Sequence, residues 1–253
     1  MSGPGVKLEV RELRVRYRDA EVLKGISFDV LNNEILAVIG PANSGKSTLL
    51  IAINRMVERI PAAAVTGSIR LDGKDVREFR DVEELRRRIG MVFAVPVPLP
   101  MSIRDNVLFG PRLQRRVGNA GADELVERSL RAAFLWDEVK DRLGSSGLAL
   151  SGGQQQRLCL ARTLAVDPDV IMLDEPCSGL DPISTAQVEE ALRDLRRRHT
   201  IILVTNNTKQ ASRVGDRTAF LLMGEMIEID DTEVIFTRPA RQKTEEYVTG
   251  RFG

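Results

Sequence analysis

Residues 40–47 have the composition of a phosphate-binding loop. They read Gly-Pro-Ala-Asn-Ser-Gly-Lys-Ser and fit the pattern G-x-x-x-x-G-K-[ST]. Glycines let the backbone curl so that consecutive N–H groups face one anion, and a helix start behind the loop adds partial positive charge. Lys46 would hold the β- and γ-phosphates of a nucleotide as a point charge, and the Ser47 hydroxyl would ligate Mg²⁺. The predicted binding residues are Gly40, Pro41, Ala42, Asn43, Ser44, Gly45, Lys46, Ser47 and Thr48.

An acidic pair, Asp174 and Glu175, follows the apolar run at residues 170–173. If that run is a strand beside the one that precedes the loop, Asp174 can reach the Mg²⁺ shell. Glu175 can polarise a water for in-line attack on the γ-phosphate. Alone, such a pair is more often a solvated strand end, but the loop at residues 40–47 favours the catalytic interpretation.

A second turn lies about 20 residues before Asp174. It reads Ser151-Gly152-Gly153-Gln154 and precedes a segment whose apolar residues Leu158, Ala161 and Ala165 have helical spacing. An amide-rich turn at a helix start is a second potential anion site. An N-cap without a ligand is the alternative.

The elements expected to position these residues alternate between strands and helices. The patterns predict strands at residues 7–17, 27–30, 34–39, 68–71, 170–173 and 201–204, and helices at 48–57, 123–136 and 183–198. Short, wholly apolar runs flanked by helices are typical of a parallel sheet that is covered on both faces. The predicted fold class is α/β.

Composition excludes other kinds of site. One histidine, His199, and two cysteines, Cys159 and Cys177, cannot supply a histidine metal site, a Ser-His-Asp triad or a disulfide framework. A net charge of +1 in 253 residues gives no support to a broad nucleic-acid surface. Every apolar run is shorter than the ~20 residues that span a bilayer. We therefore expect a globular protein of the reducing cytoplasm that is not itself inserted in a membrane.

The loop, the turn and the acidic pair, in this order, resemble the motifs of ATP-binding cassette (ABC) proteins across essentially the whole chain. The resemblance implies a P-loop (RecA-like), mostly parallel sheet with an N-terminal antiparallel β subdomain and an inserted α-helical subdomain. It implies a single ATPase domain over residues 1–253, with the core at 6–93 and 156–253 and the helical insert at 94–155. ATP and Mg²⁺ are the implied ligands, with Lys46 and Glu175 catalytic and with Ser47 and Asp174 holding the metal.

The resemblance also implies a head-to-tail homodimer. Each ATP would lie between one subunit's loop and the other subunit's signature turn, formed by Ser151, Gly152, Gly153 and Gln154. Tyr17 resembles the aromatic residue that stacks on adenine, although an ordinary strand aromatic is the alternative. Asp181 resembles the aspartate that the family carries into the dimer interface.

Two positions depart from the family pattern. The family has a Gln after the strand that ends near Phe93, and this chain has Ala94. The family has a His beside the γ-phosphate where this chain has Asn206, whose amide can donate a hydrogen bond but cannot carry a charge. We include Asn206 among the catalytic residues and predict weak but measurable ATP hydrolysis.

Residues 100–112, the glutamines at 154–156 and residues 247–253 resemble the ATPase subunit of bacterial inorganic-phosphate importers. The implied location is peripheral, on the cytoplasmic face of the cell membrane. Two integral membrane permease subunits would dock near the Pro-rich loop at residues 94–101, and an extracytoplasmic solute-binding protein would act indirectly. No nucleic acid is expected. The alternative is a soluble, non-transport ABC ATPase that acts on nucleic acid or the ribosome.

Overall fold

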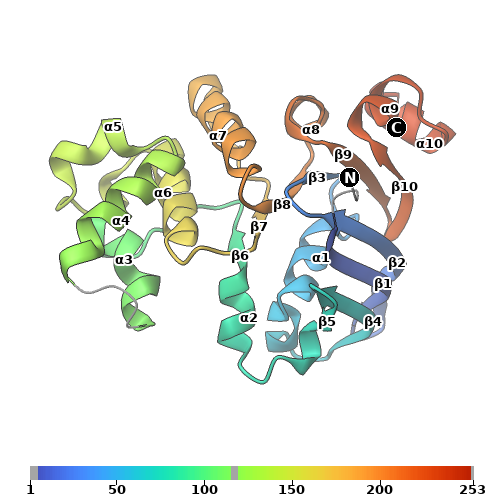
Figure 1. Ribbon diagram of the computed structural model, residues 1–253. Helices are drawn as coiled ribbons and strands as arrows, with labels where there is room; N and C mark the ends of the chain where they lie inside the picture. Colours follow the sequence, from blue (N-terminus) through green and yellow to red (C-terminus); the bar gives the residue numbers. More distant parts are fainter. Residues whose placement is uncertain (1–4, 115–118, 252–253) are drawn as a thin grey trace.

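The computed structural model describes residues 5–114 and 119–251 (Figure 1). Residues 252 and 253, the end of the stretch 247–253, lie outside this part. Two β-sheets form within it. The first is antiparallel at every pair, has the order β2-β1-β4-β5 and contains β1 (Val6–Tyr17), β2 (Ala20–Leu31), β4 (Ala63–Leu71) and β5 (Lys74–Asp75).

The second sheet has the order β10-β9-β3-β8-β7-β6. All its neighbouring strands run parallel except β10, which pairs antiparallel with β9. Its strands are β3 (Ile35–Ile39), β6 (Ile89–Val92), β7 (Val170–Asp174), β8 (Thr200–Thr205), β9 (Arg217–Leu222) and β10 (Glu225–Asp231). The predicted α/β class, mostly parallel sheet and N-terminal antiparallel sheet are confirmed.

The helices lie on both faces of the parallel sheet and at its two ends (Figure 1). They are α1 (Lys46–Ile53), α2 (Val82–Arg88), α3 (Ile103–Leu113), α4 (Asn119–Ala132), α5 (Trp136–Val139), α6 (Gly152–Leu164), α7 (Pro182–Leu195), α8 (Thr208–Val214), α9 (Thr232–Thr237) and α10 (Gln242–Val248). Helices α3 to α6 gather at one end of the molecule, and the antiparallel sheet lies at the other (Figure 1). The predicted boundary between residues 155 and 156 falls inside α6.

Two hydrophobic clusters explain why the central strands are apolar throughout. In β8, Ile201 and Leu203 pack into a cluster shared with helices α3 to α7, whereas Ile202 and Val204 pack toward α1 and the antiparallel sheet. Side chains of a strand alternate between its two faces, so both faces of β8 must be apolar. The strand therefore has no solvent-facing side along which polar residues could alternate.

Several helices and strands begin or end at residues other than those predicted from the sequence. The helix predicted at residues 48–57 ends at Ile53, because Asn54 leaves the helical conformation and Arg55 adopts a left-handed one, with φ 59°. The strands predicted at 27–30 and 68–71 extend to the full β2 and β4, since pairing with β1 orders residues that carry no alternating pattern. No described helix is both long enough and apolar enough to cross a lipid bilayer.

Replacing the fully buried Leu203 with alanine is expected to lower the free energy of unfolding by about 2–5 kcal/mol, because a cavity forms between β8 and the helices that cover it. Denaturant unfolding measures this change. Leu113→Ala is the matched control, because Leu113 is 71% exposed. Equal losses in the two variants would contradict the expected packing around β8.

Candidate functional site

The carboxyl ends of β3, β8 and β7 meet at one edge of the parallel sheet. Ile39 is in register with Thr205, and Val204 is in register with Asp174. Segments that follow neighbouring parallel strands converge at this edge. Here a hydrogen bond of 2.7 Å joins Lys46 Nζ to Asn206 Oδ1, and one of 3.0 Å joins the Asn206 N–H to Glu175 Oε2. The structure thus brings Lys46, Glu175 and Asn206 together.

Two glycines give the loop after β3 its shape. A Cβ on Gly40 would lie 2.0 Å from the carbonyl oxygen of Leu221, which leaves no room for a side chain. Gly45 has φ +98°, and a Cβ there would lie 3.0 Å from the Val22 carbonyl oxygen. The left-handed backbone at Gly45 is also unfavourable for residues with a Cβ. The glycines of the sequence pattern are therefore required by close backbone contacts as well as by the curl of the loop.

Lys46 is buried at the first position of α1. Its ammonium donates hydrogen bonds to the carbonyl oxygens of Gly40, at 2.8 Å, and Pro41, at 2.9 Å, in addition to Asn206. Burial lowers the pKa of Lys46, and the Glu175 and Asp174 carboxylates oppose this effect. These three bonds use all three N–H donors of the ammonium, so a phosphate bound to Lys46 would replace at least one of these acceptors.

The two carboxylates have oxygen atoms that lack partners. Asp174 Oδ1 and Glu175 Oε1 are buried, and neither accepts a hydrogen bond from the described residues. Burial, with a smaller contribution from Asp174, raises the pKa of Glu175, while the Asn206 N–H and Lys46 oppose that rise. A raised pKa favours a role as general base, because the proton affinity of the carboxylate then lies closer to neutral pH.

This arrangement fits a nucleotide with a divalent cation. Buried carboxylate oxygens without hydrogen bonds are costly unless a ligand satisfies them. Carboxylate and hydroxyl oxygens are the ligands that Mg²⁺ prefers in proteins, and Asp174 and Ser47 supply one of each kind. The Ser44 hydroxyl is also buried without a partner among the described residues.

Comparison with known proteins agrees with this geometry. A family model described as "ABC transporter" matches residues 23–178, which include the loop, the turn and the acidic pair. The chain belongs to the ABC transporter family. Its ATPase domain therefore binds ATP, normally with Mg²⁺, and couples ATP hydrolysis to transport.

Two solved structures of the family resemble this chain. CbiO1 from Clostridium perfringens, part of the ABC transporter complex CbiONQ, is 26% identical with a TM-score of 0.81, and the match covers 92% of each chain. A bacterial Atm1-family ABC exporter with ATP bound is 22% identical with a TM-score of 0.82. That match covers all of this chain and 44% of the exporter chain, and it supports the ABC ATPase fold.

The signature turn lies at the start of α6, away from α1 (Figure 1). Ser151 is the N-cap, and its hydroxyl accepts a hydrogen bond from the Gln154 N–H while Gln154 Oε1 accepts one from the Ser151 N–H. This reciprocal arrangement is a capping box. A Cβ on Gly152 would meet nothing within 4 Å. The backbone of the first turn is therefore open at Gly152.

Tyr17 and Asp181 occupy different settings. Tyr17 lies half-buried at the end of β1, paired with Ala63 of β4. Asp181 is the exposed N-cap of α7, and its carboxylate accepts hydrogen bonds from the Ile183 and Ser184 backbones and from the Ser184 hydroxyl. These bonds hold the pKa of Asp181 below its ordinary value. The side chain thereby fixes the start of α7.

The loop after β6 contains one contact that sequence reasoning missed. Ala94 lies just beyond this strand, and the side chain of Gln156 in α6 donates a 3.0 Å hydrogen bond to the neighbouring Phe93 carbonyl. Gln156 is 2% exposed, and its Oε1 has no partner among the described residues. Its place in the run of three glutamines gave no sign of this contact, because only folding brings α6 against β6.

The loop at residues 40–47 is also held by segments near the C-terminus. The Gly224 N–H donates a 3.0 Å hydrogen bond to the Ser44 carbonyl oxygen. Tyr247 of α10 stacks on Phe220 of β9, with ring centroids 4.8 Å apart, and its hydroxyl forms a hydrogen bond with the Gly40 backbone. The stretch at residues 247–253 was recognised in the sequence only as a family resemblance. The contact of Tyr247 with the loop depends on the position of α10.

Proposed function

We propose that this protein is the ATP-hydrolysing, energy-coupling subunit of an importer for inorganic phosphate, bound peripherally to the cytoplasmic face of the cell membrane. The observation that supports the proposal most strongly is that Asn206 links Lys46 to Glu175 at the sheet edge where Asp174 Oδ1 and Glu175 Oε1 lack partners among the described residues. A cation beside free carboxylate oxygens suits a metal-bound polyphosphate. The specificity for phosphate is supported by the sequence resemblance at residues 100–112 and 247–253.

In this proposal, each group at the sheet edge has one role. The backbone N–H groups of residues 40–48 and the Lys46 ammonium bind the phosphates, and Ser47 and Asp174 hold Mg²⁺. When bound, Mg²⁺ would neutralise charge on the β- and γ-phosphates. Glu175 orients a water and takes its proton, while Asn206 keeps the Glu175 carboxylate in place through its backbone N–H. Tyr17 stacks on the adenine.

The proposed assembly is a head-to-tail homodimer. The signature turn of one subunit, with Ser151 and Gln154, would cover the nucleotide in the loop of the other, and Asp181 would lie at the interface. Support comes from the open surface at Gly152 and from the position of the turn on α6, away from the loop of its own subunit.

The proposed contact with two permease subunits is the loop at residues 94–101, which introduces the helical subdomain proposed at residues 94–155. Val95 is 71% exposed and Val97 is 58% exposed, so the loop carries apolar surface. The similarity to a subunit of the CbiONQ transporter complex supports membrane partners of this kind. A solute-binding protein would act through those partners. Co-purification from membranes tests this assembly, because a subunit that never carries integral membrane proteins would contradict it.

Hydrolysis is expected to be slow because this chain has Ala94 and Asn206 where the family has Gln and His. A lost donor to a developing charge commonly costs about 3 kcal/mol, or roughly 10²-fold in rate. The variant Ala94→Gln plus Asn206→His is expected to hydrolyse ATP faster than the parent protein, with steady-state turnover as the measurement. A parent as fast as the double variant would show that other groups fill both roles.

Transport itself tests the proposed substrate. The subunit and its membrane partners are placed in vesicles, and ATP-dependent uptake of phosphate is compared with uptake of sulfate. Uptake of phosphate alone is the expected result. Uptake of another anion in preference to phosphate would leave the ATPase assignment standing and overturn the proposed solute.

A further inference from the structure

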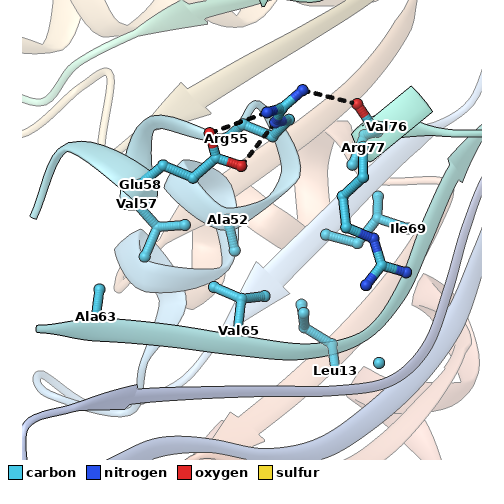
Figure 2. A pocket seen from close by; sticks show the side chains of 11 residues that line it. Leu13, Ala52, Arg55, Val57, Glu58, Ala63, Val65, Ile69, Val76 and Arg77 are labelled. Carbon is cyan, nitrogen blue, oxygen red and sulfur yellow. Dashed lines mark hydrogen bonds and ion pairs between the residues drawn. The ribbon is translucent and has the colours of Figure 1, made fainter. Parts of the chain in front are cut away.

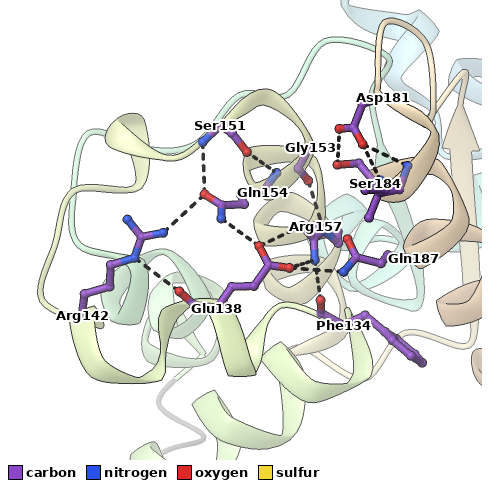
Figure 3. Close-up of polar contacts among 11 residues, drawn as sticks. Phe134, Glu138, Arg142, Ser151, Gly153, Gln154, Arg157, Asp181, Ser184 and Gln187 are labelled. Carbon is purple, nitrogen blue, oxygen red and sulfur yellow. Dashed lines mark hydrogen bonds and ion pairs between the residues drawn. The ribbon is translucent and has the colours of Figure 1, made fainter.

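Helix α6, which begins at the signature turn, contains a buried arginine that forms an ion pair with one carboxylate of the described residues. Arg157 is 2% exposed and pairs with Glu138 of α5 through Nη1–Oε1 and Nη2–Oε2 contacts of 2.6 and 3.2 Å (Figure 3). Its guanidinium also donates to the carbonyl oxygens of Phe134 and Gly153. Removing one partner of a buried ion pair leaves an uncompensated charge. The burial of Arg157 therefore depends on the carboxylate of Glu138.

Glu138 also accepts hydrogen bonds from two glutamine side chains on different helices. Gln154 of α6 donates to Oε2 at 2.8 Å, and Gln187 of α7 donates to Oε1 at 3.3 Å (Figure 3). Partial burial opposes ionisation, but the bonds from Arg157, Gln154 and Gln187 hold the pKa of Glu138 below its ordinary value. The carboxylate is therefore ionised at neutral pH and joins α5, α6 and α7.

Through Gln154, Glu138 helps to fix the signature turn. The Gln154 amide has its NH₂ group directed at Glu138, while Oε1 accepts the Ser151 N–H at 3.2 Å and a longer bond of 3.5 Å from Arg142 (Figure 3). An amide offers donors on one side and an acceptor on the other, so the acceptor at Glu138 favours this orientation, and Arg142 supports it. The capping box of the signature turn is thus completed by a residue outside the motif.

Through Gln187, Glu138 also links the turn to α7. Helices α6 and α7 approach closely at their starts. A Cβ on Gly153 of α6 would lie only 2.3 Å from the Ser184 hydroxyl oxygen of α7. Asp181, the N-cap of α7, accepts hydrogen bonds from Ser184. The segment that follows Glu175 therefore leads into a helix whose first turns contact the signature turn directly and also through Glu138.

We propose that Glu138 is a positioning residue for the signature turn and that its carboxylate couples the orientation of that turn to α7. The inference rests on the proposed dimer, in which the turn covers the nucleotide of the second subunit. Glu138 acts in this proposal through Gln154 and not by contact with the nucleotide. Its loss should therefore weaken the ATP-dependent dimer while leaving the binding of MgATP to a single subunit intact.

The test compares Glu138→Gln with Glu127→Gln, each in a Glu175→Gln background that slows hydrolysis. Glu127 is the matched control, because its partner Arg131 lies one turn away on the same helix and both side chains are about half-exposed. Sedimentation with MgATP measures dimerisation, a fluorescent ATP analogue measures binding to the loop, and thermal unfolding measures folding. Glu138→Gln is expected to weaken dimerisation about tenfold or more, whereas analogue affinity stays within about twofold.

Gln187→Ala keeps the test decisive if Glu138→Gln unfolds. It removes the bond to α7 without leaving the Arg157 charge unpaired, and it should also weaken dimerisation. If Gln187→Ala and any folded Glu138→Gln protein dimerise as well as the Glu127→Gln control, the inference is overturned and the proposed function stands. If the background protein binds MgATP but does not dimerise, the proposed assembly fails, and the inference fails with it for that separate reason.

Discussion

Replacing Glu175 with glutamine is expected to lower the steady-state ATPase rate by roughly 10²–10⁴-fold, the usual contribution of a positioned general base. The amide keeps the size of the side chain and can still accept the Asn206 N–H, but it cannot take a proton from water. MgATP binding should change little, because Lys46 and the loop remain. Steady-state turnover and analogue binding measure the two effects separately.

The same variant has a predicted effect on stability. Burial raises the pKa of Glu175, so keeping this carboxylate ionised at neutral pH lowers the free energy of unfolding of the nucleotide-free protein. Glu175→Gln removes that cost and is expected to raise the Tm at pH 7. The difference should disappear below the ordinary carboxylate pKa, where Glu175 is protonated in both the folded and the unfolded state.

A Glu175→Gln variant that hydrolyses ATP at the parental rate would contradict the assignment of Glu175 as the base.

Replacing Lys46 with alanine is expected to weaken MgATP binding roughly 10- to 100-fold, since a hydrogen bond to a charged group contributes about 1.5–3 kcal/mol. Hydrolysis should fall further, because charge on the transferred phosphoryl group is no longer stabilised. Calorimetry with a non-hydrolysable ATP analogue measures the binding, and single-turnover kinetics measure the chemical step.

Lys74→Ala is the control for Lys46→Ala. Lys74 lies on β5 in the antiparallel sheet, with its ammonium 4.1 Å from the Phe79 ring centre. It belongs to no part of the proposed site, so MgATP binding is expected to match the parent. If the two alanine variants bind MgATP equally well, the loop at residues 40–47 is not the phosphate site.

The local motifs could be predicted from the sequence because each depends on residues that are close together in the chain. The loop from Gly40 to Ser47 requires particular backbone conformations and one lysine, and consecutive residues of the chain supply both. The same holds for the capping turn at Ser151 and for Asp174 at the end of an apolar strand. The α/β class followed in the same way, from apolar runs of strand length separated by helical segments.

Contacts between distant segments could not be predicted, because their energy depends on burial that exists only in the folded chain. Glu138 and Arg157 are ordinary charged residues in the sequence, and they become a required pair only when α5 and α6 bury the guanidinium. Gln156 likewise reaches the Phe93 carbonyl, next to Ala94, only after α6 packs against β6. By itself, the sequence determined the chemistry at the sheet edge. Only the tertiary structure decided which side chains hold that chemistry in position.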